Sequence, residues 1–354
     1  MTEQEILWRR HCRRKAFKHA VEAPFAWLGI GLGLVFFRFL PRRGLLFVCD
    51  ILSAAFYRLD RRGRRRALET LRILRGTCTG DEGTPAFDSD RAVFDPTPRE
   101  ATILRRSYRN MARTVGHIFW TCAGDVRRVP LAGELGDHAR RFLRENRSAV
   151  TVSAHVGCWE ILSQLAFLEG HRMISVAKRI GSGRMTKLLI RSRQSIGQEI
   201  VEAKGAMKFL MKGIAEGKSL GLLVDQSVDP KDGGLWIRFL GRPMPVSAAP
   251  AFFAAKAKVP IVVAWSRPLR DGRYRCEVVD EISAGEARDL WEATQRCATD
   301  IERIVRRHPS CWVMNYNFFS NVPTDEDAAG LLSRERRAAS AGIRERGGKA
   351  WETD

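Results

Sequence analysis

The sequence predicts an α/β fold in which helices cover a mixed sheet, preceded by a membrane-associated helical segment. From about residue 149 onward, β-prone and helix-prone segments alternate, which is the pattern of a sheet covered by helices. The first 75 residues are instead apolar and basic. With 354 residues, of which 45% are hydrophobic and 28% charged, the chain is long enough to bury a large core.

Residues 1–75 combine two apolar runs with an excess of positive charge. They hold seventeen Lys and Arg against six Asp and Glu, in a chain whose net charge is +20. The apolar runs, residues 23–37 and 44–57, are shorter than the ~20 residues that span a bilayer. Three interpretations stay open: a short or tilted membrane anchor, a hairpin lying in the membrane interface, or a buried helix pair in a soluble core.

The basic block at residues 58–66 indicates which kind of anionic partner the protein binds. Clustered arginines attract either nucleic-acid phosphates or the anionic headgroups of a membrane. No recognition-helix or aromatic pattern typical of nucleic-acid binding accompanies the block. We therefore expect anionic membrane lipids as partners and no nucleic acid.

The rest of the chain divides by composition and periodicity. Residues 76–99, rich in Gly, Asp and Pro, are predicted to be a linker, residues 100–322 the α/β domain, and residues 323–354 a charged flexible tail. Strands are predicted over residues 149–154, 173–176, 219–224, 260–265 and 274–279. Helices are predicted over residues 100–120, 161–168, 185–196, 206–215, 249–257 and 288–305.

Cysteine and histidine usage argues against a metal site. The eight cysteines include no C-x-x-C pair, and the seven histidines show no ligand spacing. We therefore predict no metal and no disulfide framework, which is typical of a reducing compartment.

The chemistry-bearing motif is the stretch that contains His155 and Glu160. An imidazole titrates near 6.5, so it can take a proton from a hydroxyl, and a carboxylate on its far nitrogen fixes its tautomer. Residues five apart in one helix lie roughly 140° apart around its axis. The two side chains therefore meet only if His155 precedes a helix and Glu160 lies on its first turn. The spacing predicts a general base with its orienting carboxylate.

Further polar stretches follow the histidine in a consistent order. Arg179 comes directly after a predicted strand, and an apolar strand ends in Asp225 and Gln226. Because functional loops lie at the carboxyl ends of strands in such sheets, these side chains are candidates for the same site. Two later stretches are the tight turn Phe239-Leu240-Gly241-Arg242-Pro243 and the strand start Val259-Pro260.

Together these stretches resemble the lysophospholipid acyltransferase superfamily, and within it the late lipid A acyltransferases and their mannoside-acylating relatives. The resemblance covers roughly residues 100–320, and His155-Val156-Gly157-Cys158-Trp159-Glu160 is similar to the H-F-G-N-W-E of that branch. Two departures are the Val and Cys inside this motif and the ending Trp312-Val313-Met314-Asn315-Tyr316-Asn317-Phe318-Phe319, which replaces a tryptophan-and-arginine ending. The departures leave the histidine and the glutamate in place but weaken the assignment of a lipid A acceptor.

The resemblance implies a role for each candidate residue. His155 is the general base and Glu160 its partner, while Arg179 holds the acceptor's phosphate or the acyl donor. The remaining candidates bind substrate: Asp225 and Gln226 at the floor of the site, with Gly241 and Arg242. The co-substrate is a fatty acyl thioester of acyl carrier protein or coenzyme A, and no cofactor is required.

The expected reaction is acyl transfer to a glycolipid hydroxyl, catalysed at the cytoplasmic face of the inner membrane. It needs donors for the oxyanion, and backbone N–H groups near Gly157 are candidates. We expect direct attack by the acceptor, with Cys158 a small apolar residue and not a nucleophile. Two alternatives are a glycerolipid acceptor and a non-enzymatic basic protein that binds membrane or nucleic acid.

Overall fold

The fold is described from a computed structural model. It describes residues 39–76, 96–123, 126–177, 197–202 and 205–316, together with the single positions 190, 193, 194, 318, 332 and 336. The predicted apolar run 23–37, most of the linker, most of the helix at 185–196 and nearly all of the tail lie outside the described residues.

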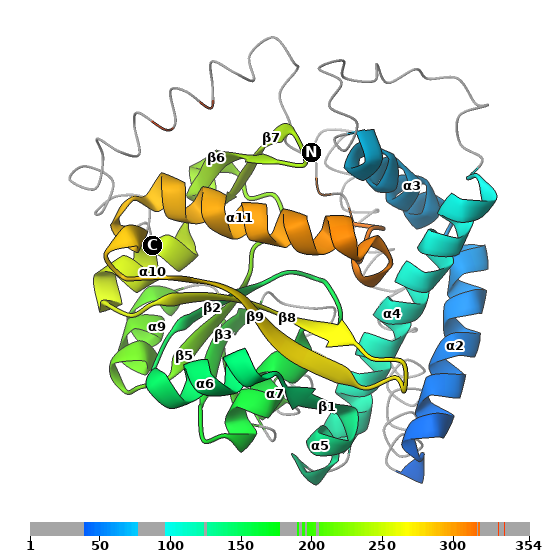
Figure 1. The fold of residues 1–354 in the computed structure, drawn as a ribbon, viewed down its shortest axis with the longest axis horizontal. Coiled ribbons are helices and arrows are strands. Elements are labelled where there is room, and N and C mark those ends of the chain that lie inside the picture. The colour runs from blue at the N-terminus through cyan, green and yellow to red at the C-terminus, as the bar shows by residue number, and fades with distance from the viewer. Residues whose placement is uncertain are drawn as a thin grey trace, which may run out of the picture.

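A mixed seven-stranded sheet forms the centre of the molecule (Figure 1), as the sequence predicts. Its order is β1-β9-β8-β2-β5-β3-β4, with β8 and β9 antiparallel and the other neighbours parallel. Its strands are β1 (Gly133–Leu135), β2 (Val150–Ser153), β3 (Met173–Ala177), β4 (Gln198–Glu202), β5 (Ser219–Leu223), β8 (Ile261–Pro268) and β9 (Tyr274–Ile282).

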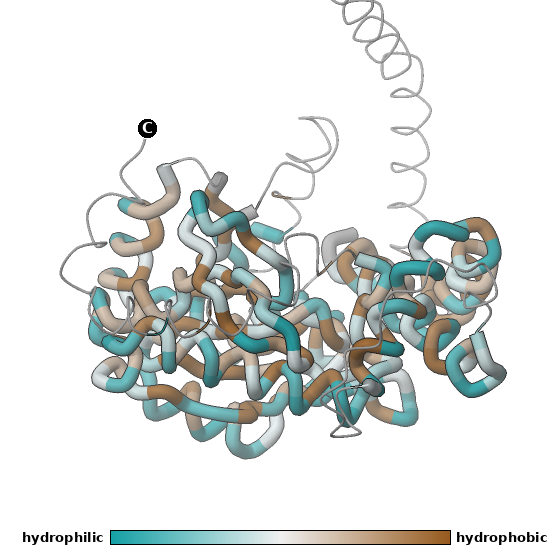
Figure 2. Tube along the Cα trace, turned by 90° about the horizontal axis from the view of Figure 1, so that it is seen from above, coloured by the Kyte–Doolittle hydropathy of each residue, from teal (hydrophilic) through white to brown (hydrophobic). Residues whose placement is uncertain are grey.

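Helices cover both faces of the sheet, as strand–helix alternation requires. One face packs against α6 (Asp137–Glu145) and α7 (Glu160–Leu168). The other carries α9 (Ala206–Ala215), α10 (Ala249–Ala257) and α11 (Leu290–Arg307). Figure 2 shows hydrophobic segments running through the interior between these layers.

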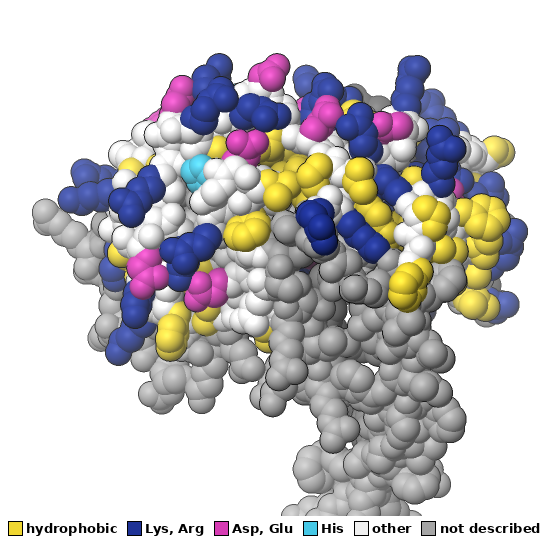
Figure 3. Space-filling model, turned by 90° about the horizontal axis from the view of Figure 1, so that it is seen from below, with side chains coloured by type: hydrophobic (Ala, Val, Ile, Leu, Met, Phe, Trp, Pro, Cys, Tyr) yellow, Lys and Arg dark blue, Asp and Glu magenta, His cyan; other side chains and the backbone are white. Residues whose placement is uncertain are grey.

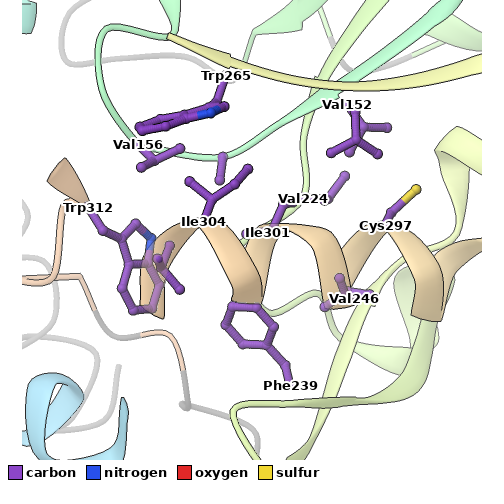
Figure 4. Close-up of a cluster of buried hydrophobic side chains, with 14 of the residues drawn as sticks. Val152, Val156, Val224, Phe239, Val246, Trp265, Cys297, Ile301, Ile304 and Trp312 are labelled. Atoms are coloured by element: carbon purple, nitrogen blue, oxygen red, sulfur yellow. The ribbon is translucent and has the colours of Figure 1, made fainter. Parts of the chain in front are cut away.

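The larger core lies between α11 and the sheet. Figure 4 shows Ile301 and Ile304 on the side of α11 that faces the sheet, with Val224 near Ile301 and with Val156 and Trp265 near Ile304. Trp312 closes one end of this cluster and lies beside Val156. The loop that carries His155 is thus built on a packed hydrophobic layer.

Three helices stand beside the sheet at the N-terminal end of the described chain: α2 (Arg42–Leu59), α3 (Arg61–Gly76) and α4 (Pro98–Ala123). Both α2 and α3 pack against α4. Tyr57 and Leu71 enter the larger core, and Leu45 enters a second cluster with α7. Within the described residues, none of the helices is both long enough and apolar enough to cross a bilayer.

A separate hairpin, β6 (Gly234–Phe239) and β7 (Arg242–Ser247), packs on α11. Its two turn residues, Leu240 and Gly241, have φ of 51° and 76°, which is the backbone of a tight two-residue hairpin turn. The sequence predicts the turn but not the strands, since β7 contains Pro243 and Pro245. A strand with one unpaired edge tolerates proline because its N–H groups on that edge need no partner.

Most predicted elements are confirmed within two or three residues at each end. The helices at 206–215 and 249–257 have the predicted bounds, and the predicted helix at 100–120 lies within α4. The sequence reading missed β1, β4, the hairpin strands and α6. Of these, β1 and β4 lie at the two sheet edges. β1 is three residues long, and three of the five residues of β4 are polar (Gln198, Glu199 and Glu202), so neither forms a detectable apolar run.

Candidate active site

His155 and Asp225 form a buried hydrogen-bonded pair at the carboxyl end of the sheet. Oδ1 of Asp225 lies 2.8 Å from Nδ1 of His155, and Oδ2 accepts the backbone N–H of His155 at 2.9 Å. The Asp225 side chain is fully buried, while 23% of the His155 side chain is exposed. No described residue bonds Nε2 of the imidazole, so this nitrogen is available to a substrate hydroxyl.

The strand register brings the two residues together. β2 and β5 are parallel neighbours, and Ser153 at the end of β2 pairs with Leu223 at the end of β5. His155 and Asp225 each follow two residues later, so both chains leave the same edge of the sheet side by side. Parallel neighbours place such residues in one loop cluster.

The segment after α11 holds this pair from the other side. Trp312 donates its indole N–H to Oδ2 of Asp225 at 2.9 Å and is itself completely buried. Val313 donates its backbone N–H to the carbonyl of His155 at 3.0 Å. The Trp312 ring stacks on Phe318 at 4.4 Å and meets Phe239 edge-on at 6.2 Å. These contacts leave Asp225 with three donors and fix the His155 backbone.

Gly157 shapes the turn between His155 and α7. Its φ is +62°, and a Cβ at this position would lie 1.8 Å from the carbonyl oxygen of Ser266. From α4, Asn110 and Thr114 both donate to the Gly157 carbonyl, at 3.1 and 2.9 Å. Only glycine fits this close approach, so the turn that presents the histidine is rigidly held.

The electrostatics of the pair suit a base held by an ionised acid. Burial disfavours the imidazolium of His155, but the charge and hydrogen bond of Asp225 and the charge of Glu160 outweigh it, so the pKa of His155 is raised. For Asp225, burial disfavours the carboxylate, yet its bonds with His155 and Trp312 leave its pKa lowered. Asp225 therefore stays ionised and stabilises a proton on the ring.

The predicted contact between His155 and Glu160 is not formed, which corrects the sequence interpretation. Glu160 is the first residue of α7, and its carboxylate binds Arg193 at 2.6 and 3.2 Å. The side chain is buried, with 5% exposed. The left-handed turn at Gly157 carries the chain away from the ring before α7 begins, so Glu160 acts on His155 through its charge and not through a bond.

The structure brings only some of the other predicted site residues close to this pair. Gln226 follows Asp225 directly and is half-buried. Gly241 lies in the hairpin turn and Arg242 begins β7, and no described contact joins either of them to His155. Phe239 of the same hairpin meets Trp312, which bonds to Asp225. Arg179 lies outside the described residues.

Backbone N–H groups next to Gly157 are already used, against the expectation that they bind an oxyanion. The Gly157 N–H donates to the carbonyl of Cys311 at 2.9 Å, and that of Cys158 to the Ser266 hydroxyl at 2.7 Å. The thiol of Cys158 is buried, which raises its pKa to about 12. A thiol with this pKa is not a nucleophile near neutral pH.

No cluster of three or more metal-ligating side chains occurs among the described residues. His117 is buried in the core. Its Nε2 lies 2.9 Å from Oε1 of Gln164, and burial lowers its pKa to about 4.

Two functional contacts escaped the sequence reading: Asp225 as the partner of the ring, and Trp312. The sequence did contain a signal for Asp225: this acid and His155 each come directly after an apolar strand, and the two strands are similar in composition. The missing information was that β5 returns beside β2, with β3 and β4 placed beyond it. Trp312 gave no signal, because a tryptophan after a helix is usually a packing residue.

An α/β fold that presents a histidine–carboxylate pair at the carboxyl end of its sheet is suited to proton transfer with a bound substrate. The model of the family described as bacterial lipid A biosynthesis acyltransferase matches residues 92–320, about two thirds of the chain. The chain belongs to this family, which makes it an acyltransferase and confirms the resemblance seen in the sequence. The comparison with curated proteins returned no match.

Proposed function

We propose that the protein is a membrane-associated O-acyltransferase that moves a fatty acyl chain from a thioester to the hydroxyl of a glycolipid. The observation that carries this proposal is the His155–Asp225 pair, whose imidazole keeps Nε2 free while Nδ1 is bound. Family membership favours this function over a non-enzymatic basic protein.

In the proposed mechanism His155 is the general base. Nε2 removes the proton from the acceptor hydroxyl as its oxygen attacks the thioester carbonyl carbon. The tetrahedral intermediate collapses, the carbon–sulfur bond breaks, and the departing thiolate takes the proton from the imidazolium. Asp225 keeps Nδ1 protonated and stabilises the cation that forms between these steps.

Glu160 and Arg193 serve the site in a different way. Their ion pair places a second carboxylate near His155, and its charge helps to raise the pKa of the ring. We propose that Glu160 strengthens the base electrostatically. Arg179, Gln226, Gly241 and Arg242 remain the proposed contacts for the donor and the acceptor.

The family description supports a lipid A-related acceptor, and the acyl donor is proposed from the resemblance seen in the sequence. A lipid A-like glycolipid is the proposed acceptor, and acyl carrier protein or coenzyme A carries the acyl chain. The proposal requires no cofactor, because His155 supplies the base, Asp225 orients it and the thioester supplies the activated acyl group. The donors for the oxyanion lie elsewhere than at the N–H groups of Gly157 and Cys158.

The exposed side of α2 supports association with the membrane. It carries five large exposed apolar side chains: Phe47, Ile51, Leu52, Phe56 and Leu59. Figure 3 shows hydrophobic side chains beside arginines and lysines at the edge of the molecule that α2 occupies in Figure 1. An amphipathic helix with these neighbours lies in the lipid interface, which favours the cytoplasmic face of the inner membrane as the site of action.

The test is acyl transfer by purified protein and by its His155→Ala variant. Removal of the base is expected to lower transfer by about 10²–10⁴-fold, without changing vesicle binding. Equal transfer by the two proteins would refute the assigned chemistry. Mass spectrometry of lipids from cells with and without the protein identifies the acceptor, as the glycolipid that loses one acyl chain.

A further inference from the structure

A basic cavity of about 520 Å³ lies between α2, α3 and α4. Its lining contains four arginines from three helices, Arg58 on α2, Arg64 on α3, and Arg105 and Arg109 on α4. None of the residues that line it contacts His155 or Asp225. The cavity is therefore separate from the site described above.

Positive charge in this cavity exceeds the negative charge that faces it. Among the described lining residues Asp50 is the one acid, and both of its oxygens accept from Arg113 at 2.8 Å, while Arg109 lies 3.6 Å away. Asp60 is not part of that lining, and its oxygens accept from the Tyr108 hydroxyl and the Gly63 N–H. Arg113 thus neutralises Asp50, and the lining keeps an excess of guanidinium groups.

Tyr57 holds two of these guanidinium groups close together. Arg64 lies over its ring at 5.2 Å and Arg105 at 5.8 Å. The ring is itself buried and meets Tyr108 edge-on at 5.3 Å, so it is a fixed platform. Nε of Arg64 is buried and bonds to no described residue. Two like charges held on one ring beside one cavity are arranged for an anion.

An apolar stripe leads into the cavity. Phe47 and Ile51 precede Ala54 and Arg58 on α2 at the i, i+4, i+7, i+11 spacing, which places all four on one side of the helix. Phe47 and Ile51 are 68% and 54% exposed, whereas Ala54 and Arg58 line the cavity. An anion site that continues into exposed apolar side chains fits an amphiphile better than a free ion.

We propose that this cavity binds the phosphate group of a membrane lipid, with Arg64 and Arg105 on the phosphate and with Phe47 and Ile51 against the first carbons of the acyl chains. Guanidinium groups match phosphate oxygens because they donate two parallel hydrogen bonds. The proposal deepens the membrane association proposed above and does not depend on acyl transfer. It gives the association a defined headgroup site in place of diffuse charge attraction.

The experiment measures binding of the full chain to vesicles of phosphatidylcholine with and without phosphatidylglycerol, in a buffer free of phosphate. The double variant Arg64→Gln, Arg105→Gln is expected to bind anionic vesicles about 100-fold more weakly than its matched control, since each charge-assisted headgroup contact is worth roughly a tenfold change in affinity beyond diffuse charge attraction. The matched control, Arg61→Gln with Arg62→Gln, removes equal charge from exposed positions of α3 outside the cavity. It is expected to lose only the diffuse attraction of two surface charges, about 25-fold at most.

A second measurement separates a lipid headgroup from free phosphate. This measurement is the rise in the melting temperature of the protein on addition of glycerol phosphate, which the cavity is expected to bind. The double variant Phe47→Ser, Ile51→Ser should keep this rise but bind vesicles more weakly. Equal losses in the cavity variant and the control would overturn the proposal. So would a cavity variant that loses the response to glycerol phosphate but binds vesicles like the wild type, because the occupant would then be a soluble phosphate. If the double variant has a lower melting temperature than the wild type, Arg58→Gln, at the exposed rim of the cavity, is used in its place in the vesicle-binding measurement.

Discussion

Trp312 donates its indole N–H to Oδ2 of Asp225 at 2.9 Å, and the same oxygen accepts the backbone N–H of His155. One buried carboxylate oxygen therefore joins the segment after α11 to the loop that carries the base. The contact fixes which way the Asp225 carboxylate faces, and with it the orientation of the imidazole ring.

Removal of the indole donor should weaken both the fold and the reaction. Trp312→Phe keeps an aromatic ring in the stack with Phe318 but leaves Asp225 one donor short. A hydrogen bond to a charged group contributes about 1.5–3 kcal/mol, so the free energy of unfolding should fall by about that amount. Urea unfolding and kcat are the measurements. Trp265→Phe, in the same core, is the control and should lose stability without a selective loss of kcat.

Asp225→Asn should change both the rate and its pH dependence. The pKa of His155 is raised partly by the Asp225 charge, so wild-type kcat/KM should increase with pH until the ring loses its proton. The variant loses the charge, and the acid limb of its profile should move to lower pH. Because the amide no longer holds the tautomer, kcat should fall by about 10²–10⁴-fold. A profile that keeps its acid limb in place would show that His155 is not the titrating base.

Glu160→Gln should distinguish the effect of the Glu160 carboxylate on the imidazole ring from that of the Asp225 carboxylate. The acid limb again moves to lower pH, because the Glu160 charge also raises the pKa of His155. The Nδ1 proton should still give a downfield NMR signal in Glu160→Gln, and this signal should be lost in Asp225→Asn. Loss of the signal in Glu160→Gln would contradict the observed pairing.

Gly157→Ala should be strongly destabilising. The added Cβ would lie 1.8 Å from the Ser266 carbonyl oxygen, at a φ of +62° that side chains disfavour. Overpacking and the left-handed backbone together should cost about 3–5 kcal/mol, measured by thermal or urea unfolding. Gly205→Ala is the control: its φ is +70°, but a Cβ there meets nothing within 4 Å, so it should lose only the backbone contribution.

Asp300 should make stability depend on pH away from the active site. Burial and the neighbouring carboxylate of Asp280 raise its pKa to about 6, above the ordinary value of 3.8. Between these values the folded state binds more protons than the unfolded state, so stability should fall as pH rises from about 4 to 6.

Asp300→Asn removes that titration and should raise the free energy of unfolding above pH 6 by up to about 3 kcal/mol. Urea unfolding at acidic and neutral pH checks this, with the exposed Asp232→Asn as a variant expected to change little. A variant less stable than the wild type above pH 6 would contradict the assignment.

Local sequence patterns predicted the parts of the fold that local patterns determine. The periodicity of α9 and α10 and the apolar runs of β2 and β5 identified these elements. The same information placed His155 before a helix. It did not identify the partner of the ring, because the neighbour of β2 depends on how the chain returns across the sheet. Glu160 is near in sequence and Asp225 near in space, and only the strand order distinguishes them.

The strap formed by Trp312 and Val313 has a consequence for how the enzyme matures. A nascent chain that already contains His155 and Asp225 still lacks the N–H donors of Trp312 and Val313, which hold these two residues in place. A fragment that ends before residue 312 would keep every residue of the motif around His155, yet the orientation of its imidazole ring would not be fixed. The orientation of the imidazole is therefore fixed only once α11 and the segment after it have packed against the sheet.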